Sequence, residues 1–300
     1  MSVMNSPAQW ENEATLVGYL ARQLIRGRLG LFLGAGISGF YGLPDWRDLI
    51  SGLCVANSEP PLEKGEDVVA KAGYLRARHY SRDRERFKKD VKALLYAGRS
   101  LDFAKIRESD TLSAIGSLVM SSRRGSAAKV FTLNYDDLLE NYLEFHGFTT
   151  ESIWCGRHWA QNEDVVIYHP HGFLPQASGK DSEDIILGSK EYFDIIQSPL
   201  WRPILQGALR THTFIYIGLS MADLHLQSLV ADLTSFHAIS EERAAYHGVR
   251  FAIRGQRDEL GVTLREQGLH THQLEKYDPG LADFLFKICQ AARAERMSNR

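Results

Sequence analysis

Polar and glycine-rich segments follow short apolar runs at four places in this chain. These segments are residues 34–38, residues 134–136, His171 and residues 218–220. A short apolar run that stops at glycine or at polar residues is typical of a buried strand entering a turn. In an open parallel sheet, ligands bind outside the carboxyl ends of the strands, so we expect the four segments to surround one pocket. Any one of them alone would more often be an ordinary turn.

The first segment has the composition of a phosphate-binding turn. Gly34 and Gly36 follow the apolar run 29–33, and glycine permits backbone angles and close approaches that larger residues resist. Ser38 then offers a hydroxyl that can cap a helix or contact a ligand. A strand, a glycine turn and a helix in this order present backbone N–H groups to a phosphate. As a bare pattern Gly-Ala-Gly is weak, and a plain strand-to-helix turn or a kinase-like loop accounts for it equally well.

The other segments supply groups that can act on a bound molecule. Asn134 carries an amide donor and a carbonyl acceptor, and Asp136 adds a carboxylate two residues later. His171 titrates near neutral pH and is a candidate base toward a hydroxyl or a water. Two structural alternatives stay open here: Asn134 is only a turn residue, or His169 and not His171 is the base.

The elements that must position these side chains alternate between strands and helices. Hydrophobic periodicity predicts strands at 29–33, 129–133, 165–168, 213–217, 249–253 and 270–274. It predicts helices at 12–26, 45–55, 67–79, 82–95, 111–120, 138–145, 200–209, 222–233, 257–267 and 279–293. This alternation implies right-handed crossovers and a Rossmann-like, doubly wound α/β fold with a parallel sheet. We expect one domain, residues 1–300, with a smaller helical module inserted at about 56–126 and residues 1–10 loose.

Composition narrows the class of protein. The net charge of −2 gives no general attraction to nucleic acid or to an anionic membrane, and the basic run 76–92 is interpreted as a solvated helix face. No apolar run approaches the roughly 20 residues needed to span a bilayer, and the first residues do not resemble a secretory signal. The three cysteines have no pairing pattern, which favours a reducing compartment. We therefore expect a cytoplasmic protein.

An ordered set of motifs resembles the sirtuin superfamily. Gly42-Leu43-Pro44-Asp45-Trp46-Arg47 is similar to the sirtuin cofactor loop, and three later segments are similar to further sirtuin motifs, namely Thr132-x-Asn134-x-Asp136, His171-Gly172 and Gly218-Leu219-Ser220. The chain departs from the deacylase pattern at Leu133, where glutamine is usual, and it lacks the two Cys-x-x-Cys pairs of the zinc module. The Thr-x-Asn-Tyr-Asp form and the segment Gly-Leu-Ser-Met-Ala-Asp-Leu-His look closer to the sirtuin-like domains of bacterial anti-phage systems. The resemblance covers about residues 30–277.

The resemblance implies NAD⁺ as the substrate and assigns roles to the motif residues. The implied catalytic residues are Asn134, His171 and Asp136. The implied NAD⁺-binding residues are Gly34, Ala35, Gly36, Ser38, Asp45, Arg47, Thr132, Gly218 and Ser220. No metal is expected, because the three scattered cysteines cannot form the zinc site and His212, His225 and His237 have no ligand spacing.

Three functions remain open at this stage. The first is an NAD⁺ hydrolase that yields nicotinamide and ADP-ribose and depletes NAD⁺ in anti-phage defence. The second is a zinc-less NAD⁺-dependent protein deacylase or ADP-ribosyltransferase, and the third is a non-catalytic nucleotide sensor. Because an unregulated NAD⁺ hydrolase would harm its host, we expect control by homo-oligomerisation or by a separate subunit. The resemblance suggests a HerA-type DNA translocase ATPase or an Argonaute-like protein as that subunit, without direct nucleic-acid binding by this chain.

Overall fold

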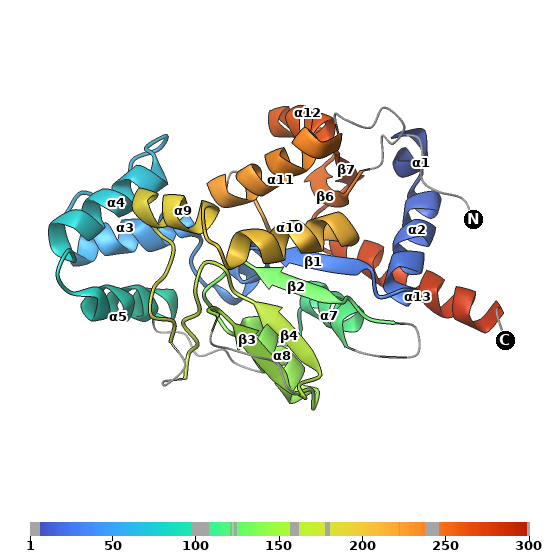
Figure 1. The fold of residues 1–300 in the computed structure, drawn as a ribbon, viewed down its shortest axis with the longest axis horizontal. Coiled ribbons are helices and arrows are strands. Elements are labelled where there is room, and N and C mark those ends of the chain that lie inside the picture. Colours follow the sequence, from blue (N-terminus) through green and yellow to red (C-terminus); the bar gives the residue numbers. More distant parts are fainter. Residues whose placement is uncertain are drawn as a thin grey trace.

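The computed structural model describes residues 7–97, 108–120, 122, 125–156, 162–177, 181–221, 223–237 and 246–298 (Figure 1). Its centre is a seven-stranded sheet in the order β3-β4-β2-β1-β5-β6-β7. The strands are β1 (Leu29–Leu33), β2 (Lys129–Thr132), β3 (Thr150–Ile153), β4 (Val165–Tyr168), β5 (Thr213–Ile217), β6 (Gly248–Ile253) and β7 (Leu269–Leu274). Every neighbouring pair is parallel, which confirms the predicted Rossmann-like α/β fold.

β1 lies in the middle of the sheet and all five of its residues are buried. Leu29, Leu31 and Leu33 belong to one core cluster, whereas Phe32 belongs to the cluster on the opposite face. This alternation is the period-two pattern of a strand covered on both faces. Helices α2 (Glu13–Ile25), α7 (Asp110–Val119), α8 (Leu138–Phe145) and α13 (Gly280–Ser298) contribute to the first cluster, and α10 (Trp201–Thr211) and α11 (Leu224–His237) to the second.

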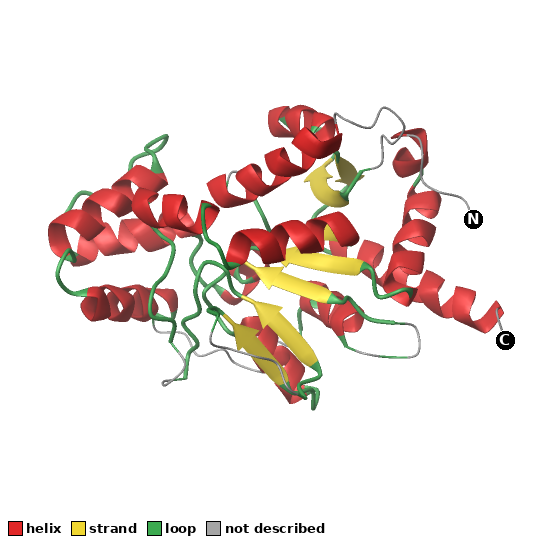
Figure 2. Ribbon diagram, in the orientation of Figure 1, coloured by secondary structure: helices red, strands yellow, loops and turns green. Residues whose placement is uncertain are grey.

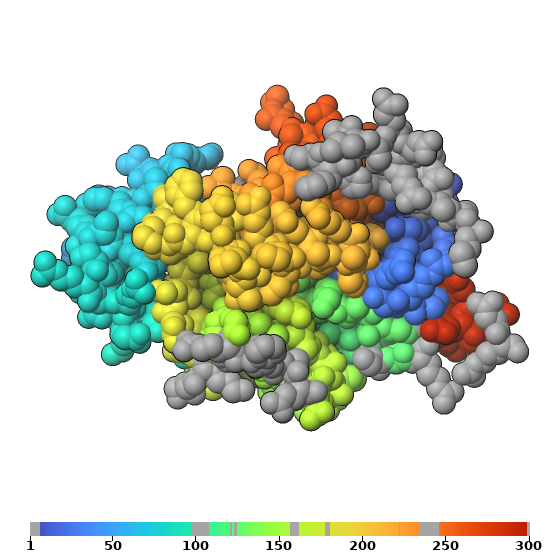
Figure 3. All heavy atoms as spheres, viewed as in Figure 1, coloured from blue at the N-terminus to red at the C-terminus, as the bar shows by residue number. Residues whose placement is uncertain are grey.

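A helical lobe stands at one end of the molecule, on the left in Figures 1 and 2. It consists of α3 (Trp46–Ala56), α4 (Val68–His79) and α5 (Arg84–Leu95), with α9 (Ser189–Ile196) beside α4. The space-filling view shows α9 joining this lobe to the body of the molecule (Figure 3). Helix α7 lies instead against α13 and α8, under the sheet. The lobe therefore includes only part of the range 56–126, and the predicted domain boundaries stay a prediction.

One smaller expectation from the sequence is wrong. Residues 7–10 are not loose, because α1 (Pro7–Glu11) places Trp10 fully buried beside Tyr19 and Tyr246. The basic run 76–92 agrees with the predicted solvated face at most of its cations, which are exposed, but two of its cations have structural partners. Arg76 pairs with Glu191 of α9 at 3.2 Å, and buried Lys88 donates to the Ser182 carbonyl at 3.1 Å, so these two cations connect the lobe to α9 and to the segment that precedes it.

The remaining differences between prediction and structure concern one edge strand of the sheet and the length of one helix. Strand β3 was not predicted, because Thr-Glu-Ser-Ile at the sheet edge carries too few apolar residues to be recognised as a strand. Helix α12 (Glu259–Glu266) is shorter than predicted. None of the helices in the described part of the chain is long and apolar enough to cross a membrane.

Candidate functional site

The carboxyl ends of β1, β2 and β5 open into a cavity of about 660 Å³ between the sheet and the helical lobe. Most of the residues that the sequence singled out line this cavity, namely Gly34, Ala35, Gly36, Ser38, Asp45, Arg47, Asn134, Asp136, His171, Gly218 and Ser220. Thr132 does not line it. Its hydroxyl lies behind Asn134 and accepts a hydrogen bond from the Asn134 backbone N–H at 3.1 Å.

The glycines of the first turn allow two backbones to touch. Gly34 N–H donates to the carbonyl at the end of β5, and Gly36 N–H donates to the Gly218 carbonyl, both at 2.9 Å. A Cβ on Gly36 would lie 2.7 Å from the Gly218 Cα, a distance that real Cβ atoms do not adopt. These N–H groups are therefore used to join β1 to β5. The sequence had predicted instead that they face a phosphate.

A short hydrogen-bond chain connects the turn after β1 with the segment after β2. The Asn134 side-chain Nδ2 donates to the Gly34 carbonyl at 3.2 Å and to the Ser38 Oγ at 3.0 Å. The Ser38 hydroxyl in turn donates to Asp136 Oδ2 at 2.9 Å. Because both donors of the Asn134 amide are held by neighbours, the orientation of its carbonyl oxygen is fixed.

Asp136 is buried, and its environment disfavours the charged form. Desolvation raises the pKa of this carboxyl to about 6, while the hydrogen bonds from the Ser38 hydroxyl and the Leu138 N–H lower it in part. Asp136 therefore changes charge in a range where most aspartates are already ionised.

His171 lies at the side of the cavity among three polar residues. Its Nε2 is 3.2 Å from His225 Nδ1, and its Nδ1 is 4.0 Å from Asp223 Oδ2, which accepts a 2.6 Å hydrogen bond from the Tyr192 hydroxyl. Burial lowers the pKa of His171, and the Asp223 carboxylate opposes this shift only in part. His171 is therefore a neutral imidazole near pH 7, the form in which it accepts a proton.

Sequence reasoning assigned no role in the site to the residues around His171. Asp223 and Tyr192 also line the cavity, and His225 is buried behind His171 with its pKa lowered to about 3, mainly by desolvation. The available signal was the segment Gly-Leu-Ser-Met-Ala-Asp-Leu-His, which contains Asp223 and His225 and served only to support the resemblance. Their contact with residue 171 depends on how α11 packs, which the pattern does not contain.

The loop that enters α3 is shaped by its own hydrogen bonds. Asp45 caps α3 by accepting from the Asp48 N–H, and the Arg47 guanidinium donates to the carbonyls of Glu63 and Glu66 at 2.9 Å. Trp46 lies in the cavity wall, with its ring centroid 5.7 Å from that of Tyr192. Arg47 thus holds the α3–α4 connection while facing the cavity.

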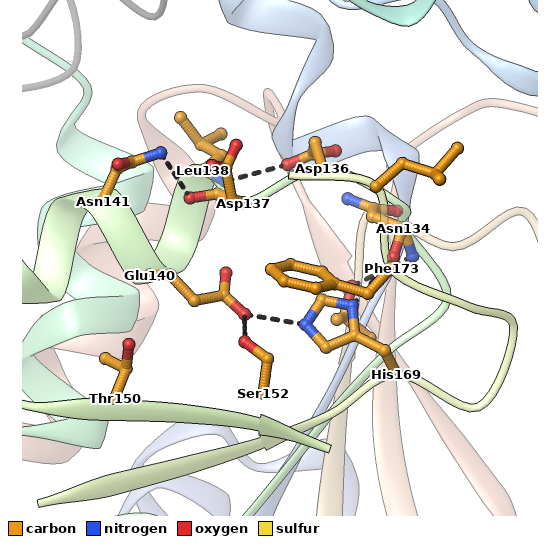
Figure 4. Close-up of polar contacts among 12 residues, drawn as sticks. Asn134, Asp136, Asp137, Leu138, Glu140, Asn141, Thr150, Ser152, His169 and Phe173 are labelled. Carbon is orange, nitrogen blue, oxygen red and sulfur yellow. Dashed lines mark hydrogen bonds and ion pairs between the residues drawn. The ribbon is translucent and has the colours of Figure 1, made fainter. Parts of the chain in front are cut away.

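The two histidines of the His-Pro-His segment have different surroundings. His171 lines the cavity, whereas His169 is fully buried and does not. Figure 4 shows the His169 ring between the Asn134 backbone and Glu140 of α8. Its position does not support the alternative in which His169 is the base.

Potential metal ligands do not cluster among the residues that the structure describes. No group of three or more histidine, cysteine, aspartate or glutamate side chains within them is arranged to hold a metal ion. Cys54 and Cys289 are buried, and all three cysteines are free thiols.

The structure thus has a Rossmann-like parallel sheet with a glycine turn, an asparagine and a histidine around one cavity at its carboxyl edge. Residues 128–272 match the family described as SIR2-like domain. The chain is 23% identical to the NAD(+) hydrolase ThsA of Acinetobacter baumannii over 236 residues, which cover 77% of this chain and 44% of that protein. It is 22% identical to the NAD(+) hydrolase ThsA of Enterococcus faecium over 228 residues, 74% of this chain and 43% of that protein. The chain thus spans less than half the length of these curated relatives.

Proposed function

We propose that this protein hydrolyses NAD⁺ to nicotinamide and ADP-ribose and acts as an NAD⁺-depleting effector in anti-phage defence. The observation that carries the proposal is that the Asn134 amide and the His171 imidazole line the same cavity, above the glycine turn of β1. The two relatives named NAD(+) hydrolase support the choice of substrate. A cavity of about 660 Å³ is within the range of about 300–1,000 Å³ that small-molecule sites occupy.

The chemistry requires little acid catalysis. When the bond between the ribose C1′ and the nicotinamide nitrogen breaks, both electrons go to the nitrogen, so the cationic pyridinium leaves as neutral nicotinamide. Positive charge develops on the ribose, as in glycoside hydrolysis. A water oxygen then forms the new bond to C1′, and its proton must be accepted by a base.

The residues of the cavity match these requirements. The Asn134 amide oxygen, held in place through Gly34 and Ser38, orients the attacking water and faces the developing charge. His171 is a neutral imidazole near pH 7 and accepts the proton of the water or of a ribose hydroxyl. Asp136 contacts the nicotinamide carboxamide in this proposal, while also holding Ser38.

The decisive experiment measures nicotinamide release from NAD⁺ by the full chain, alone and with candidate activators. Asn134→Ala and His171→Ala should each lower kcat by about 100-fold or more, the scale of losing one well-placed catalytic group. Glu144→Gln is a suitable control, because it weakens an exposed hydrogen bond to Thr150 away from the cavity. If nicotinamide never appears, or if both alanine variants match the wild type, the proposal is wrong.

The same reaction mixtures distinguish the two alternative functions. A zinc-less deacylase would form O-acyl-ADP-ribose from an acyl-lysine peptide, and an ADP-ribosyltransferase would label protein. A nucleotide sensor would bind NAD⁺ tightly without turnover and would be indifferent to His171→Ala.

We further propose that the activity is controlled by assembly, either of this chain with itself or with a regulatory subunit such as a HerA-type ATPase or an Argonaute-like protein. The motivation is the cost to the host of continuous NAD⁺ loss. Native mass measurements on the chain alone and with each candidate test this idea. A chain that stays monomeric and fully active with every partner would contradict it.

A further inference from the structure

A buried pair of ionisable residues lies directly behind the candidate active site and is not part of the cavity. His169 Nδ1 is 3.1 Å from the Asn134 backbone carbonyl oxygen, and His169 Nε2 is 2.7 Å from Glu140 Oε1. The same Glu140 oxygen accepts a hydrogen bond from the Ser152 hydroxyl at 2.8 Å. Figure 4 shows these groups in a row, from Ser152 on β3 through Glu140 on α8 to the His169 ring. Ser152, Glu140 and Asn134 are buried, and His169 is completely buried.

The chemistry of these groups determines where the protons are. A backbone carbonyl only accepts hydrogen bonds, so His169 Nδ1 must carry a proton and donate it to the Asn134 oxygen. The contact between Nε2 and Glu140 Oε1 requires one more proton, on either atom, and the Ser152 hydroxyl supplies its own. In either arrangement the His169–Glu140 pair is neutral as a whole, which avoids the cost of an unpaired buried charge.

The Asn134 peptide is consequently held from both sides. Its N–H donates to the Thr132 hydroxyl, its carbonyl accepts from His169, and its side-chain amide donates to Gly34 and Ser38. Phe173 packs against the His169 ring, with the ring centroids 4.4 Å apart. The backbone N–H of His169 donates to the Ile153 carbonyl, so both the ring and the backbone of His169 are held in place.

We infer that His169 and Glu140 are positioning residues for the proposed reaction: they hold the Asn134 peptide so that its side-chain amide faces the reacting sugar. This inference rests on the proposed function for its kinetic readout only. The Asn134 geometry can be measured without turnover, because its amide protons are hydrogen-bonded in the resting protein.

The histidine can be replaced so as to keep one of its two contacts. His169→Asn retains a donor near the position of Nδ1, facing the Asn134 carbonyl. His169→Gln retains a donor near the position of Nε2, facing Glu140, and loses the contact to Asn134. We expect His169→Gln to lower kcat for nicotinamide release by about 10- to 100-fold with a small change in KM, the effect of a misplaced catalytic group. His169→Asn should lower kcat by less than about fivefold, the value of one weakened hydrogen bond.

A second pair of variants tests the carboxylate. Glu140→Gln can still face Nε2 with its amide N–H, which leaves the Nδ1 proton directed at Asn134, whereas Glu140→Ala removes this partner. We expect kcat to be clearly higher for the glutamine variant. The control is one helical turn away, where Glu144 accepts from the Thr150 hydroxyl at 2.9 Å. Glu144→Gln and Thr150→Val weaken the same α8–β3 contact without a link to Asn134, and they should leave kcat close to that of the wild type.

NMR of the full chain, labelled with ¹⁵N, provides the readout that does not depend on turnover. The Asn134 side-chain amide protons should be protected from exchange in the wild type and in His169→Asn, and should lose protection in His169→Gln. If this is observed but no variant hydrolyses NAD⁺, the positioning stands and the proposed function fails. If NAD⁺ is hydrolysed and both histidine variants lose kcat and Asn134 protection equally, in proportion to their loss of thermal stability, the positioning role is refuted. Unchanged Asn134 protection in His169→Gln also refutes it.

Discussion

Asp136→Asn should change how the stability of the protein depends on pH. In the native state the pKa of the Asp136 carboxyl is raised from 3.8 to about 6, chiefly by desolvation. Between these two values the native state binds more protons than the unfolded chain does, so the free energy of unfolding falls as pH rises. The stabilising contribution of Asp136 is complete below the unfolded value and is lost above about pH 6. A shift of this size corresponds to about 3 kcal/mol at most.

The asparagine variant carries no such proton, so its free energy of unfolding lacks this decline. Relative to the wild type, Asp136→Asn should therefore gain stability by up to about 3 kcal/mol as pH rises from 4 to 7. The difference in stability between the two proteins at any single pH also depends on the hydrogen bonds from Ser38 and Leu138. These two donors reach different oxygens of the Asp136 carboxylate, and asparagine has an oxygen at only one of the two positions. The change with pH is thus the informative quantity, and not the stability at any one pH.

Urea unfolding followed by tryptophan fluorescence, at half-unit steps between pH 4 and 7.5, measures this difference. Ser38→Ala is the matched perturbation, because the Ser38 hydroxyl lowers the pKa of Asp136. Removing this hydroxyl should raise the pKa of Asp136 further, so the free energy of unfolding should decline at a higher pH than in the wild type. If the curves of the wild type and Asp136→Asn run parallel across this range, the carboxyl does not titrate as its burial implies, and the reasoning about this site fails.

Two further predictions follow from the geometry of the turn and of the base. Gly36→Ala should destabilise the protein by about 1–3 kcal/mol, because the new Cβ would lie 2.7 Å from the Gly218 Cα. Gly39→Ala is the control: a Cβ at that position meets open space, so this variant should show little change in the same urea titration. Asp223→Asn removes the carboxylate that raises the pKa of His171, so this pKa falls further. Because the proposed base acts when neutral, the acidic limb of the profile of kcat against pH should move to lower pH; an unmoved limb would exclude His171 as the group that titrates there.

The central strands could be predicted because their sequence signal is local. Leu29–Leu33 is apolar and ends at a glycine, and the structure places β1 at those residues. Helix α8 likewise begins and ends where periodicity placed it. The edge strand β3 was missed because its composition is polar, and α1 was missed because burial of Trp10 depends on Tyr246, a contact across most of the chain.

The site was predictable to the extent that it consists of strand ends. Asn134 and His171 come together because parallel strands place their carboxyl ends at one edge, which follows from the topology alone. What spacing could not reveal is the direction of each side chain. His169 and His171 are two residues apart, yet the first faces Glu140 and the second faces the cavity. Only the turn after β4 decides which of the two histidines faces the cavity.

The distribution of charge around the cavity suits a ligand with both a cationic and an anionic part. Asp45 and Asp67 cap α3 and α4, so their carboxylates are partly neutralised by the positive ends of these helices. Asp136 follows β2, and Asp223 caps α11 by accepting from the Leu226 N–H; both lie beside the candidate catalytic groups. Arg47 supplies a guanidinium at the lobe side. Under the proposed function, the pyridinium of NAD⁺ belongs near Asp136 and Asp223, and its diphosphate toward Arg47 and the N-terminal ends of α3 and α4. Cleavage of the bond to the ribose would then convert the cationic pyridinium into neutral nicotinamide, which these carboxylates no longer attract, and this promotes departure of the product.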